Sequence, residues 1–342
     1  MTTGKHHATT TIAGLSFQAM RQLMVHEADE HDLPILENSD AAVSVASPFG
    51  KFGIAARDGG VELTVTGNDA EGLFLIRENL VEHLEHFLPQ VAQKLRWSDG
   101  PAIGSQPPNL HLAEVTAKQQ LCQDFVRVTL NVPSTDFFSD GAIHFRFVLP
   151  HPDDQSPQWP TLKENGALNW PKGDKELHRP VYTVAAFHAE NSTVDVDIFQ
   201  HPGGRVTAWS ASAQTGDRVA LLGPAGGSVI GETNLLLCGD ETAYPAIGRI
   251  ITALSKDAQG HVYLLSHSGA QDYPLPTHPS LTVHWLHPKD GAFSDKTFAR
   301  FEKEKQPYLW FAAHADHVKR LRTLLKPRNL PKGRSYLGTF WH

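Results

Sequence analysis

The chain changes its patterning at about Thr233, and this change limits the possible folds more than any other feature. Beyond it, short apolar runs typical of strands alternate with segments of helical character. The strand-like runs are NLLLCGDE, HVYLLSHS, LTVHWLHP, YLWFAAH and YLGTF, and the helical ones are TAYPAIGRIITAL, FARFEKE and HVKRLRTLL. Strands that alternate with helices predict a parallel, doubly wound α/β sheet over residues 231–342.

Residues 111–230 show a different pattern, in which strand-like runs follow one another with turn signals between them. The six runs are LHLAEVTAKQQ, DFVRVTLNVP, AIHFRFVLP, VYTVAAF, TVDVDIFQH and DRVALLGPAGG. Such a series predicts a closed antiparallel β-barrel. One segment, GRVTAWSASA at residues 204–213, breaks the strand pattern and predicts a short helix.

Residues 1–98 predict a small α+β domain, and residues 99–110, rich in Pro, Gly and Ser, predict a linker. One helix is expected to start near Ser16, and Asn68 or Asp69 is a suitable N-cap for a second, longer helix. The runs AVSVAS, FGKFGIAAR and GVELTVTG between them predict strands. The apolar residues at helical spacing are Phe17, Met20, Leu23 and Met24 on the first helix, and Leu73, Ile76, Leu80, Leu84 and Phe87 on the second.

Composition excludes several classes of protein. With 40% hydrophobic and 20% charged residues, the 342-residue chain has the balance of an ordinary globular protein. It contains no run of about 18 apolar residues and no apolar secretory signal, so we expect no membrane association. Cys122 and Cys238 lie far apart in the sequence, which argues against a disulfide framework and favours the cytoplasm. A net charge of −7 argues against nucleic-acid binding.

The stretch HRPVYTV, residues 178–184, combines an arginine, a tyrosine and a threonine at the start of a strand. A strand presents alternate residues on one face, so the Tyr182 ring can stack on a flat cofactor while the neighbouring Thr183 offers a hydroxyl. The guanidinium of Arg179 is a permanent forked charge suited to a diphosphate. The same pattern also fits an ordinary strand entry.

Two further segments have the character of phosphate or nucleotide sites. In GGRVT, residues 203–207, glycines open a short helix and let backbone N–H groups approach a phosphate, although a simple turn has the same pattern. In LLLCGDETAYPAI, a strand, a tight glycine turn and a helix start predict a dinucleotide crevice. Asp240 and Glu241 suit a helix N-terminus but would repel a diphosphate, so a capped structural helix is an equal alternative.

A β-barrel followed by a nucleotide-type α/β unit is the order of ferredoxin-reductase-like flavoenzymes. Residues 112–341 resemble the siderophore-interacting protein family of flavin-dependent ferric-siderophore reductases. The resemblance is carried by RPVYTV, VDVDIFQHPGGRVTAWSASAQTGDRVALLGPAGG, LLLCGDETAYPAIGRII and the C-terminal YLWFAAH and YLGTFWH. Residues 1–98 resemble, more weakly, an uncharacterised bacterial domain found ahead of such proteins.

The resemblance implies an FAD-binding barrel, an NADPH- or NADH-binding domain, and a ferric siderophore as substrate. Tyr182 and Thr183 would lie at the reacting flavin ring and serve as catalytic residues. The residues implied to bind the cofactors are Arg179, Tyr182, Thr183, His201, Gly204, Thr207 and Trp209 for FAD, and Asp240, Glu241 and Thr242 at the nicotinamide turn.

The sequence departs from the family pattern at two places. The family has an arginine after Tyr-Thr-Val, whereas Ala185 and Ala186 stand here, which removes possible phosphate contacts and would weaken FAD retention. The family's C-terminal Gly-Tyr-Trp is replaced by GTFWH at residues 338–342, which keeps an aromatic pair but loses the tyrosine hydroxyl.

Residues 314–342 carry seven basic side chains against one acid, Asp316. This cluster is suited to an anionic ferric siderophore, and equally to a solvated last helix. The residues expected at such a substrate site are Lys319, Arg322, Lys326, Arg334 and Trp341.

Four histidines in the first domain are candidates for a metal or iron-chelate site. The set comprises His26, His31, His83 and His86. Because a half-exposed helix face explains the spacing of three between His83 and His86 as well, we assign no metal site.

The expected function is therefore reduction of chelated ferric iron by a flavin that takes electrons from NADPH or NADH. Two alternatives remain: another flavin or quinone oxidoreductase on the same scaffold, or a module that binds siderophore or flavin without turnover. The sequence predicts no oligomeric state.

Overall fold

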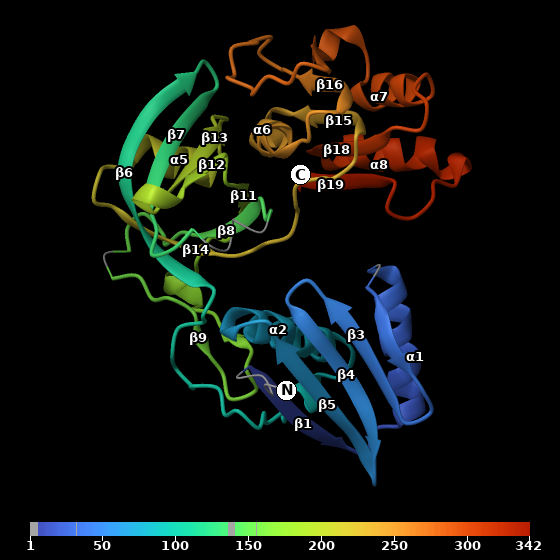
Figure 1. Ribbon diagram of the computed structural model, residues 1–342. Coiled ribbons are helices and arrows are strands. Elements are labelled where there is room, and N and C mark those ends of the chain that lie inside the picture. The colour runs from blue at the N-terminus through green and yellow to red at the C-terminus, as the bar shows by residue number, and fades with distance from the viewer. Residues whose placement is uncertain (1–5, 32, 136–140, 155) are drawn as a thin grey trace. The chain divides into compact units, whose positions relative to one another are not determined.

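The computed structural model describes residues 6–31, 33–135, 141–154 and 156–342, which form two compact units (Figure 1). The first unit comprises Met1–Leu110 and Asp153–Leu177. The second comprises His111–Pro152 and His178–His342. Residues 153–177, which the sequence analysis placed in the barrel segment, thus belong with the N-terminal unit.

The first unit is an antiparallel sheet with helices packed on it. Its strand order is β1-β5-β4-β3-β2. The strands are β1 (His7–Ala13), β2 (Ile35–Asn38), β3 (Ala42–Ser47), β4 (Gly50–Arg57) and β5 (Gly60–Gly67), and the helices are α1 (Phe17–Glu30), α2 (Ala70–Phe87) and α3 (Pro89–Ala92). Helix α1 starts after Ser16, close to the predicted start, and Asp69 is the N-cap of α2, one of the two residues predicted for that role. The Ser16 and Asp69 side chains each accept a hydrogen bond from a first-turn N–H. Strands β1 and β2 were not predicted, and all four residues of β2 are exposed, so its sequence carries no alternation.

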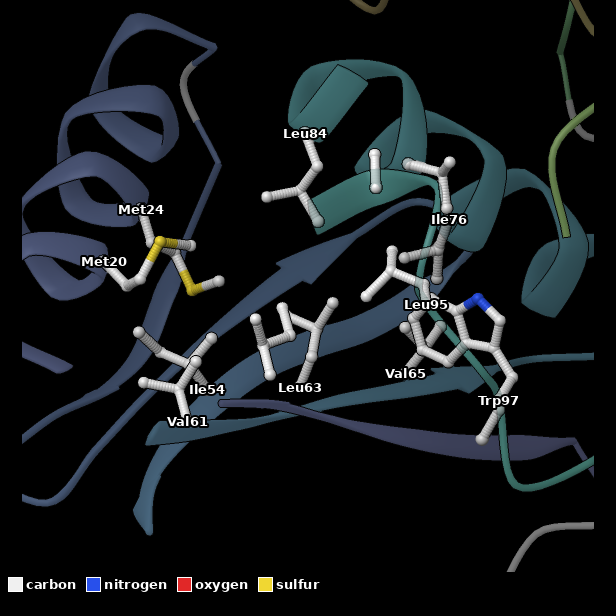
Figure 2. Packing of buried hydrophobic residues seen from close by; sticks show 14 of the residues in the cluster. Met20, Met24, Ile54, Val61, Leu63, Val65, Ile76, Leu84, Leu95 and Trp97 are labelled. Carbon is white, nitrogen blue, oxygen red and sulfur yellow. The ribbon is translucent and has the colours of Figure 1, made fainter. Parts of the chain in front are cut away.

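The core of this unit lies between the two long helices and the sheet. Figure 2 shows Met20 and Met24 from α1 and Leu84 from α2 above Ile54 and Leu63 of the sheet. The sheet residues alternate between buried and partly exposed along β5, which is the period-two pattern that predicted this strand.

The segment 153–177 completes the same core from a distant part of the chain. It contains β9 (Thr161–Leu162), β10 (Leu168–Asn169) and the short helix η1 (Gly173–Lys175). The side chain of buried Asn165 donates to the carbonyl of Ala92 at 3.0 Å, and the indole N–H of Trp97 donates to the carbonyl of Asn165 at 2.9 Å. Ala167 lies within the apolar cluster itself.

The second unit begins with a seven-stranded antiparallel sheet of order β11-β8-β14-β6-β7-β13-β12. Its strands are β6 (Leu110–Cys122), β7 (Phe125–Asn131), β8 (His144–Val148), β11 (Val181–Thr183), β12 (Ala186–His188), β13 (Thr193–Phe199) and β14 (Arg218–Leu222), with η2 (Ala189–Asn191) and α5 (Arg205–Ser212) between them. The run VYTVAAF, predicted as one strand, is divided into β11 and β12. Val184 N–H donates to the carbonyl of Ile143, and Ala185 N–H donates to that of Asp195, so the chain changes partner strand here. Strands β11 and β12, which stand first and last in the strand order of this sheet, are thus connected by Val184 and Ala185 alone.

The C-terminal part of the second unit is a parallel sheet of order β17-β16-β15-β18-β19, which confirms the predicted parallel arrangement. Its strands are β15 (Asn234–Asp240), β16 (Gln259–Leu265), β17 (Leu281–Leu286), β18 (Tyr308–His314) and β19 (Ser335–Trp341). The helices are η3 (Glu241–Ala243), α6 (Tyr244–Ala253), η4 (Pro288–Asp290), α7 (Phe293–Phe301), α8 (Ala315–Leu325) and η5 (Lys326–Arg328). Helix α6 packs with Leu235 and Leu237 on one face, whereas α7 and α8 pack with Leu236 and Cys238 on the other (Figure 1).

Cys122 and Cys238 are both free thiols, in agreement with the expected absence of a disulfide framework. Among the described residues, no helix combines the length and the apolar character needed to span a membrane.

The hydrogen bonds of Asn165 predict a difference between two adjacent substitutions. Asn165→Ala leaves the buried carbonyl of Ala92 without its donor and should weaken the docking of 153–177 by roughly 1–3 kcal/mol. Glu164→Ala removes only a surface ion pair with Arg96, worth about 0–1 kcal/mol. Tryptic cleavage at Lys163, Lys172 and Lys175 should therefore be at least about fivefold faster in Asn165→Ala and little changed in Glu164→Ala. Equal cleavage rates in the two variants would contradict this account of the docking.

Candidate functional site

Tyr182 and Thr183 lie on β11, opposite Phe145 and His144 of β8. The Tyr182 ring packs edge-on against Phe147 with centroids 5.2 Å apart, and burial raises the pKa of its hydroxyl. Val181 and Thr183 share the other face of the strand, where Val181 at the strand start is exposed and Thr183 is buried. Arg179 is exposed just ahead of the strand.

His144 is the partner of Thr183 and was not singled out from the sequence. The Thr183 hydroxyl lies 3.1 Å from His144 Nδ1. Burial lowers the pKa of His144 to about 4, so its ring is neutral at ordinary pH. Within the described part of the chain, the buried Nε2 atom of His144 has no hydrogen-bond partner. Because only the register of β8 against β11 brings the two residues together, no local sequence signal identifies this histidine.

The loop before α5 forms a small concave turn. Gly203 has a φ of +80°, and a Cβ on Gly204 would come within 2.7 Å of the His201 ring and 2.8 Å of the Thr207 hydroxyl. Gly204 is the N-cap of α5. Because it has no side chain, it neither caps the first N–H groups of the helix nor blocks access to them. Thr207 Oγ1 accepts from His201 N–H at 3.4 Å and donates to the carbonyl of Phe199 at 3.3 Å, which holds the turn.

Trp209, on the same helix, packs its ring against that of Phe147 with centroids 5.3 Å apart. The Tyr182 ring packs against the same phenylalanine. The aromatic residue of the predicted diphosphate helix and that of the predicted ring-binding strand thus share one neighbour. These predicted FAD residues are gathered in one region of the antiparallel sheet.

These residues fit FAD by their chemistry. The glycine turn is a cradle that a Cβ would fill, and a helix N-terminus supplies N–H donors and a positive dipole end for a diphosphate. The unpartnered buried nitrogen of His144, beside Thr183, is a polar group that a bound polar ring edge can satisfy. Tyr182 supplies an aromatic face.

Asp240 ends β15 and is fully buried. One of its oxygens, Oδ1, accepts from the Thr242 hydroxyl at 2.6 Å and from Thr242 N–H at 3.2 Å. The other, Oδ2, accepts from His314 N–H and from the Trp341 indole N–H, both at 2.8 Å. Burial raises the pKa of Asp240, while these donors act in the opposite direction. The carboxylate therefore ties the ends of β15, β18 and β19 together.

Glu241 is also buried, at 2% exposure, and is bound to His267 after β16. Its Oε2 lies 2.9 Å from His267 Nδ1, and this hydrogen bond raises the pKa of His267. All three predicted nicotinamide residues, Asp240, Glu241 and Thr242, thus have partners within the protein. Their role at a nicotinamide stays a prediction, and their side chains shape the turn. His267 is a further residue that the sequence analysis did not assign.

The turn lies at the topological switch point of the parallel sheet. Strand order 3-2-1-4-5 in chain order means that β15 is flanked by β16 on one side and by β18 on the other, and the crevice opens beyond their carboxyl ends. Asp240 and His314 are the residues at those two ends. Gly239 permits this geometry, because a Cβ there would meet the Ala243 side chain at 2.5 Å.

Trp341 connects the switch point to the antiparallel sheet. Its ring lies 4.7 Å from that of His314 and 6.4 Å from that of His201. The next aromatic residue, Phe340, packs edge-on against His144 at 5.3 Å. Of the two aromatic residues in the altered C-terminal motif, Trp341 therefore lies beside His201 of the predicted FAD site, and Phe340 lies beside His144, the partner of Thr183.

The structure does not bring the predicted substrate residues into one cluster. Arg334 precedes β19 and Trp341 ends it, so seven residues of extended chain, about 23 Å, separate them. Arg334 is paired with Glu232 at 3.2 Å, and Arg322 donates to the carbonyl of Leu337 at 3.0 Å. Lys319 and Lys326 are exposed on α8 and η5.

Two other cations of the basic tail are neutralised locally. Arg320 pairs with Asp295 and Arg328 with Glu302, each at 2.6 Å. The acids lie outside residues 314–342, so the count of charges along the tail overstated its positive charge.

Together, an antiparallel sheet that carries the sequence Arg-x-x-Tyr-Thr at the start of β11 and a parallel sheet with a ligand crevice define a flavoprotein of the ferredoxin-reductase type. Residues 114–228 match the siderophore-interacting FAD-binding domain, and residues 232–342 match the siderophore-interacting protein domain. The chain belongs to the siderophore-interacting protein family.

Curated relatives match the same part of the chain. The NADPH-dependent ferric-chelate reductase of Escherichia coli is 26% identical over 234 residues, which cover 66% of this chain and 89% of the relative. The mycobactin import ATP-binding/permease protein IrtA of Mycolicibacterium smegmatis is 29% identical over 222 residues. That match covers 61% of this chain but only 25% of the much longer relative.

Among solved structures, a siderophore utilization protein from T. fusca is similar with a TM-score of 0.59 and 28% identity. The similarity covers 70% of this chain and 95% of that one. This chain therefore contains residues beyond the part that is similar to that structure.

The contacts of Asp240 predict a large effect of a small substitution. Asp240→Asn replaces one acceptor oxygen by a donor that must face N–H or O–H groups, so it should lower the free energy of unfolding by roughly 1–3 kcal/mol. Hydrogen exchange along β19 should accelerate, because its Trp341 anchor is weakened. Asp257→Asn, in an exposed loop, should change stability by less than about 0.5 kcal/mol. Equal urea denaturation midpoints for Asp240→Asn and the native protein would show that Asp240 does not hold these strands.

Proposed function

We propose that this protein is a flavin-dependent ferric-siderophore reductase that uses NADPH or NADH. The observation that carries the proposal is the family match over both halves of the second unit, together with a ferric-chelate reductase from E. coli that the chain covers over 89% of its length. FAD suits this reaction because it takes two electrons together from a nicotinamide and passes them on singly to ferric iron.

The residues of the antiparallel sheet bind and orient the flavin. Tyr182 offers its ring as a stacking face, held in place by Phe147. Thr183 and the neutral His144 present a hydroxyl and an unpartnered nitrogen in a buried setting, where hydrogen bonds are strong. The turn at Gly203 and Gly204 and the N-terminus of α5 hold the diphosphate.

The nicotinamide binds at the switch point beyond β15 and β18. Asp240 keeps the two strand ends together, and Glu241 fixes His267 at the third strand end. Trp341 lies between this crevice and His201 of the FAD half, so its ring is placed to cover the reacting region. None of these groups is required to move a proton to iron.

The substrate is an iron chelate, and reduction itself releases the metal. Ferrous iron is held less tightly than ferric iron by hard oxygen ligands, so one electron for each iron is sufficient. The exposed cations Lys319 and Lys326 attract an anionic chelate from solution, while Arg334 and Arg322 serve the structure. Both cysteines are free, which agrees with work in the reducing cytoplasm.

An anaerobic spectroscopic experiment tests this function. The purified protein should be yellow, should bleach when NADPH or NADH is added, and should regain its colour when a ferric siderophore follows. A ferrous trap should then report about two ferrous ions for each nicotinamide oxidised. If a quinone restores the colour and ferric chelates do not, the protein is a quinone reductase. A colourless protein that takes up no FAD but binds ferric siderophore is a binding module.

The role of Tyr182 predicts a contrast between neighbouring positions on β11. Tyr182→Ala should weaken FAD binding by roughly 5- to 150-fold, because loss of an aromatic stacking partner costs about 1–3 kcal/mol. Val181→Ala removes an exposed side chain from the opposite face of the strand and should leave FAD content unchanged. For each variant, FAD binding is measured as the flavin content after gel filtration and as the dissociation constant for added FAD. Full FAD retention in Tyr182→Ala would remove this residue from the site.

A further inference from the structure

The N-terminal unit contains an apolar cavity of about 340 Å³ between α1, α2 and the sheet. Met20, Met24, Leu63 and Ile76 form its buried walls, and Met20 and Met24 are seen beside Leu84 in Figure 2. Nothing in the proposed reductase activity uses this cavity.

Three polar residues that also line the cavity are metal-ligating types. Glu27 and His31 lie one turn apart at the end of α1, and His83 lies on α2. Their side chains are 30%, 59% and 49% exposed, so they form the solvent-facing rim of a cavity whose walls are buried. All three ligand atoms lie within 4.8 Å of one another.

The distances within this set suit a shared ion better than direct hydrogen bonds. Glu27 Oε2 lies 3.6 Å from the Nε2 atom of His31 and also 3.6 Å from that of His83. These separations exceed the range of a good N–H···O hydrogen bond. Two ligands bound at 2.0–2.1 Å to one tetrahedral ion are about 3.4 Å apart, close to what is observed.

The orientation of His83 is set by a second contact. Its Nδ1 lies 2.8 Å from the carbonyl of Asn79, one turn earlier on α2. Because a carbonyl only accepts, Nδ1 carries the hydrogen and the neutral ring has its lone pair on Nε2, which faces Glu27. A backbone carbonyl that holds the far nitrogen of a histidine is the usual outer partner of a metal ligand.

We propose that Glu27, His31 and His83 form a binding site for a divalent first-row transition-metal ion at the rim of this cavity. Two imidazoles and one carboxylate bind zinc and ferrous iron, and three protein ligands leave a coordination position open for water or a small ligand. His26 and His86 are outside the site: His26 is exposed on α1, and His86 packs against the Phe87 ring. The proposal is independent of the reductase function.

Equilibrium dialysis of the full-length protein against Zn²⁺, with metal content measured by atomic emission, tests the site. The native protein and His26→Ala should each bind one more tight equivalent than Glu27→Gln or His83→Ala. Removing a ligand should weaken that equivalent by at least about tenfold, since even loss of an outer partner costs this much. A parallel anaerobic series with Fe²⁺ determines whether ferrous iron occupies the same equivalent.

A second measurement separates loss of a ligand from loss of the fold. The substituted side chains are exposed or, for Glu27, partly exposed, and the far-UV circular dichroism of the variants should match that of the native protein. Zn²⁺ should raise the thermal unfolding midpoint of the native protein and of His26→Ala, but not of His83→Ala. The proposal is overturned if the native protein binds no tight equivalent, if all four proteins bind alike, or if His26→Ala loses the equivalent too.

Discussion

The geometry of the second unit depends on one buried carboxylate. Asp240 is the last residue of the central strand of the parallel sheet, and it accepts hydrogen bonds from Thr242, His314 and Trp341. Burying a charge is unfavourable unless donors surround it, and here four donated hydrogen bonds offset that cost. The same contacts fix the crevice where the strand order reverses and hold the C-terminal tryptophan beside His201. A structural residue thereby places the elements of the proposed nicotinamide site.

A second constraint acts on the antiparallel sheet. Its two ends, β11 and β12, are joined by Val184 and Ala185 alone, so the chain must leave one strand partner and meet another within two residues. Before the change of partner, the pairing of β11 with β8 brings Thr183 to His144, and the Tyr182 ring packs against Phe147. The alanines that replace the family's arginine lie at this junction. The junction keeps its backbone hydrogen bonds without that side chain, so the departure leaves the sheet intact, and its effect on FAD retention stays a prediction.

The N-terminal unit has a core and polar chemistry of its own. Segment 153–177 leaves the antiparallel sheet after β8, contributes Asn165 and Ala167 to the N-terminal core, and returns before β11. The segment that precedes β11 in the chain thus belongs to the N-terminal unit. The histidine and glutamate set on α1 and α2 belongs to the N-terminal unit alone, which is why the proposed metal site and the proposed reductase can be tested separately.

Sequence patterning alone determined the order of elements. Alternating strands and helices predicted the parallel sheet. Apolar residues at helical spacing predicted the start of α1 and the N-cap pair Asn68 and Asp69 that of α2, because these signals are local along the chain. It missed β1 and also β2, whose four residues are all exposed. It joined β11 to β12, because a change of partner strand leaves no mark in residue type. It predicted Tyr182, Thr183 and Gly204 as site residues through short motifs and a family resemblance, and their roles stay predictions.

Only the tertiary structure decided which side chains meet. His144 reaches Thr183 through strand register, and His267 reaches Glu241 across two strand ends. Glu27 joins His31 and His83 because two helices pack on one sheet. The predicted cluster of basic residues in 314–342 does not form, because extended chain separates Arg334 from Trp341. In addition, acids from α7 and the segment after it pair with Arg320 and Arg328. Propensity and periodicity act between near neighbours, whereas hydrogen bonds, ion pairs and metal ligation depend on distances that only the packed chain sets.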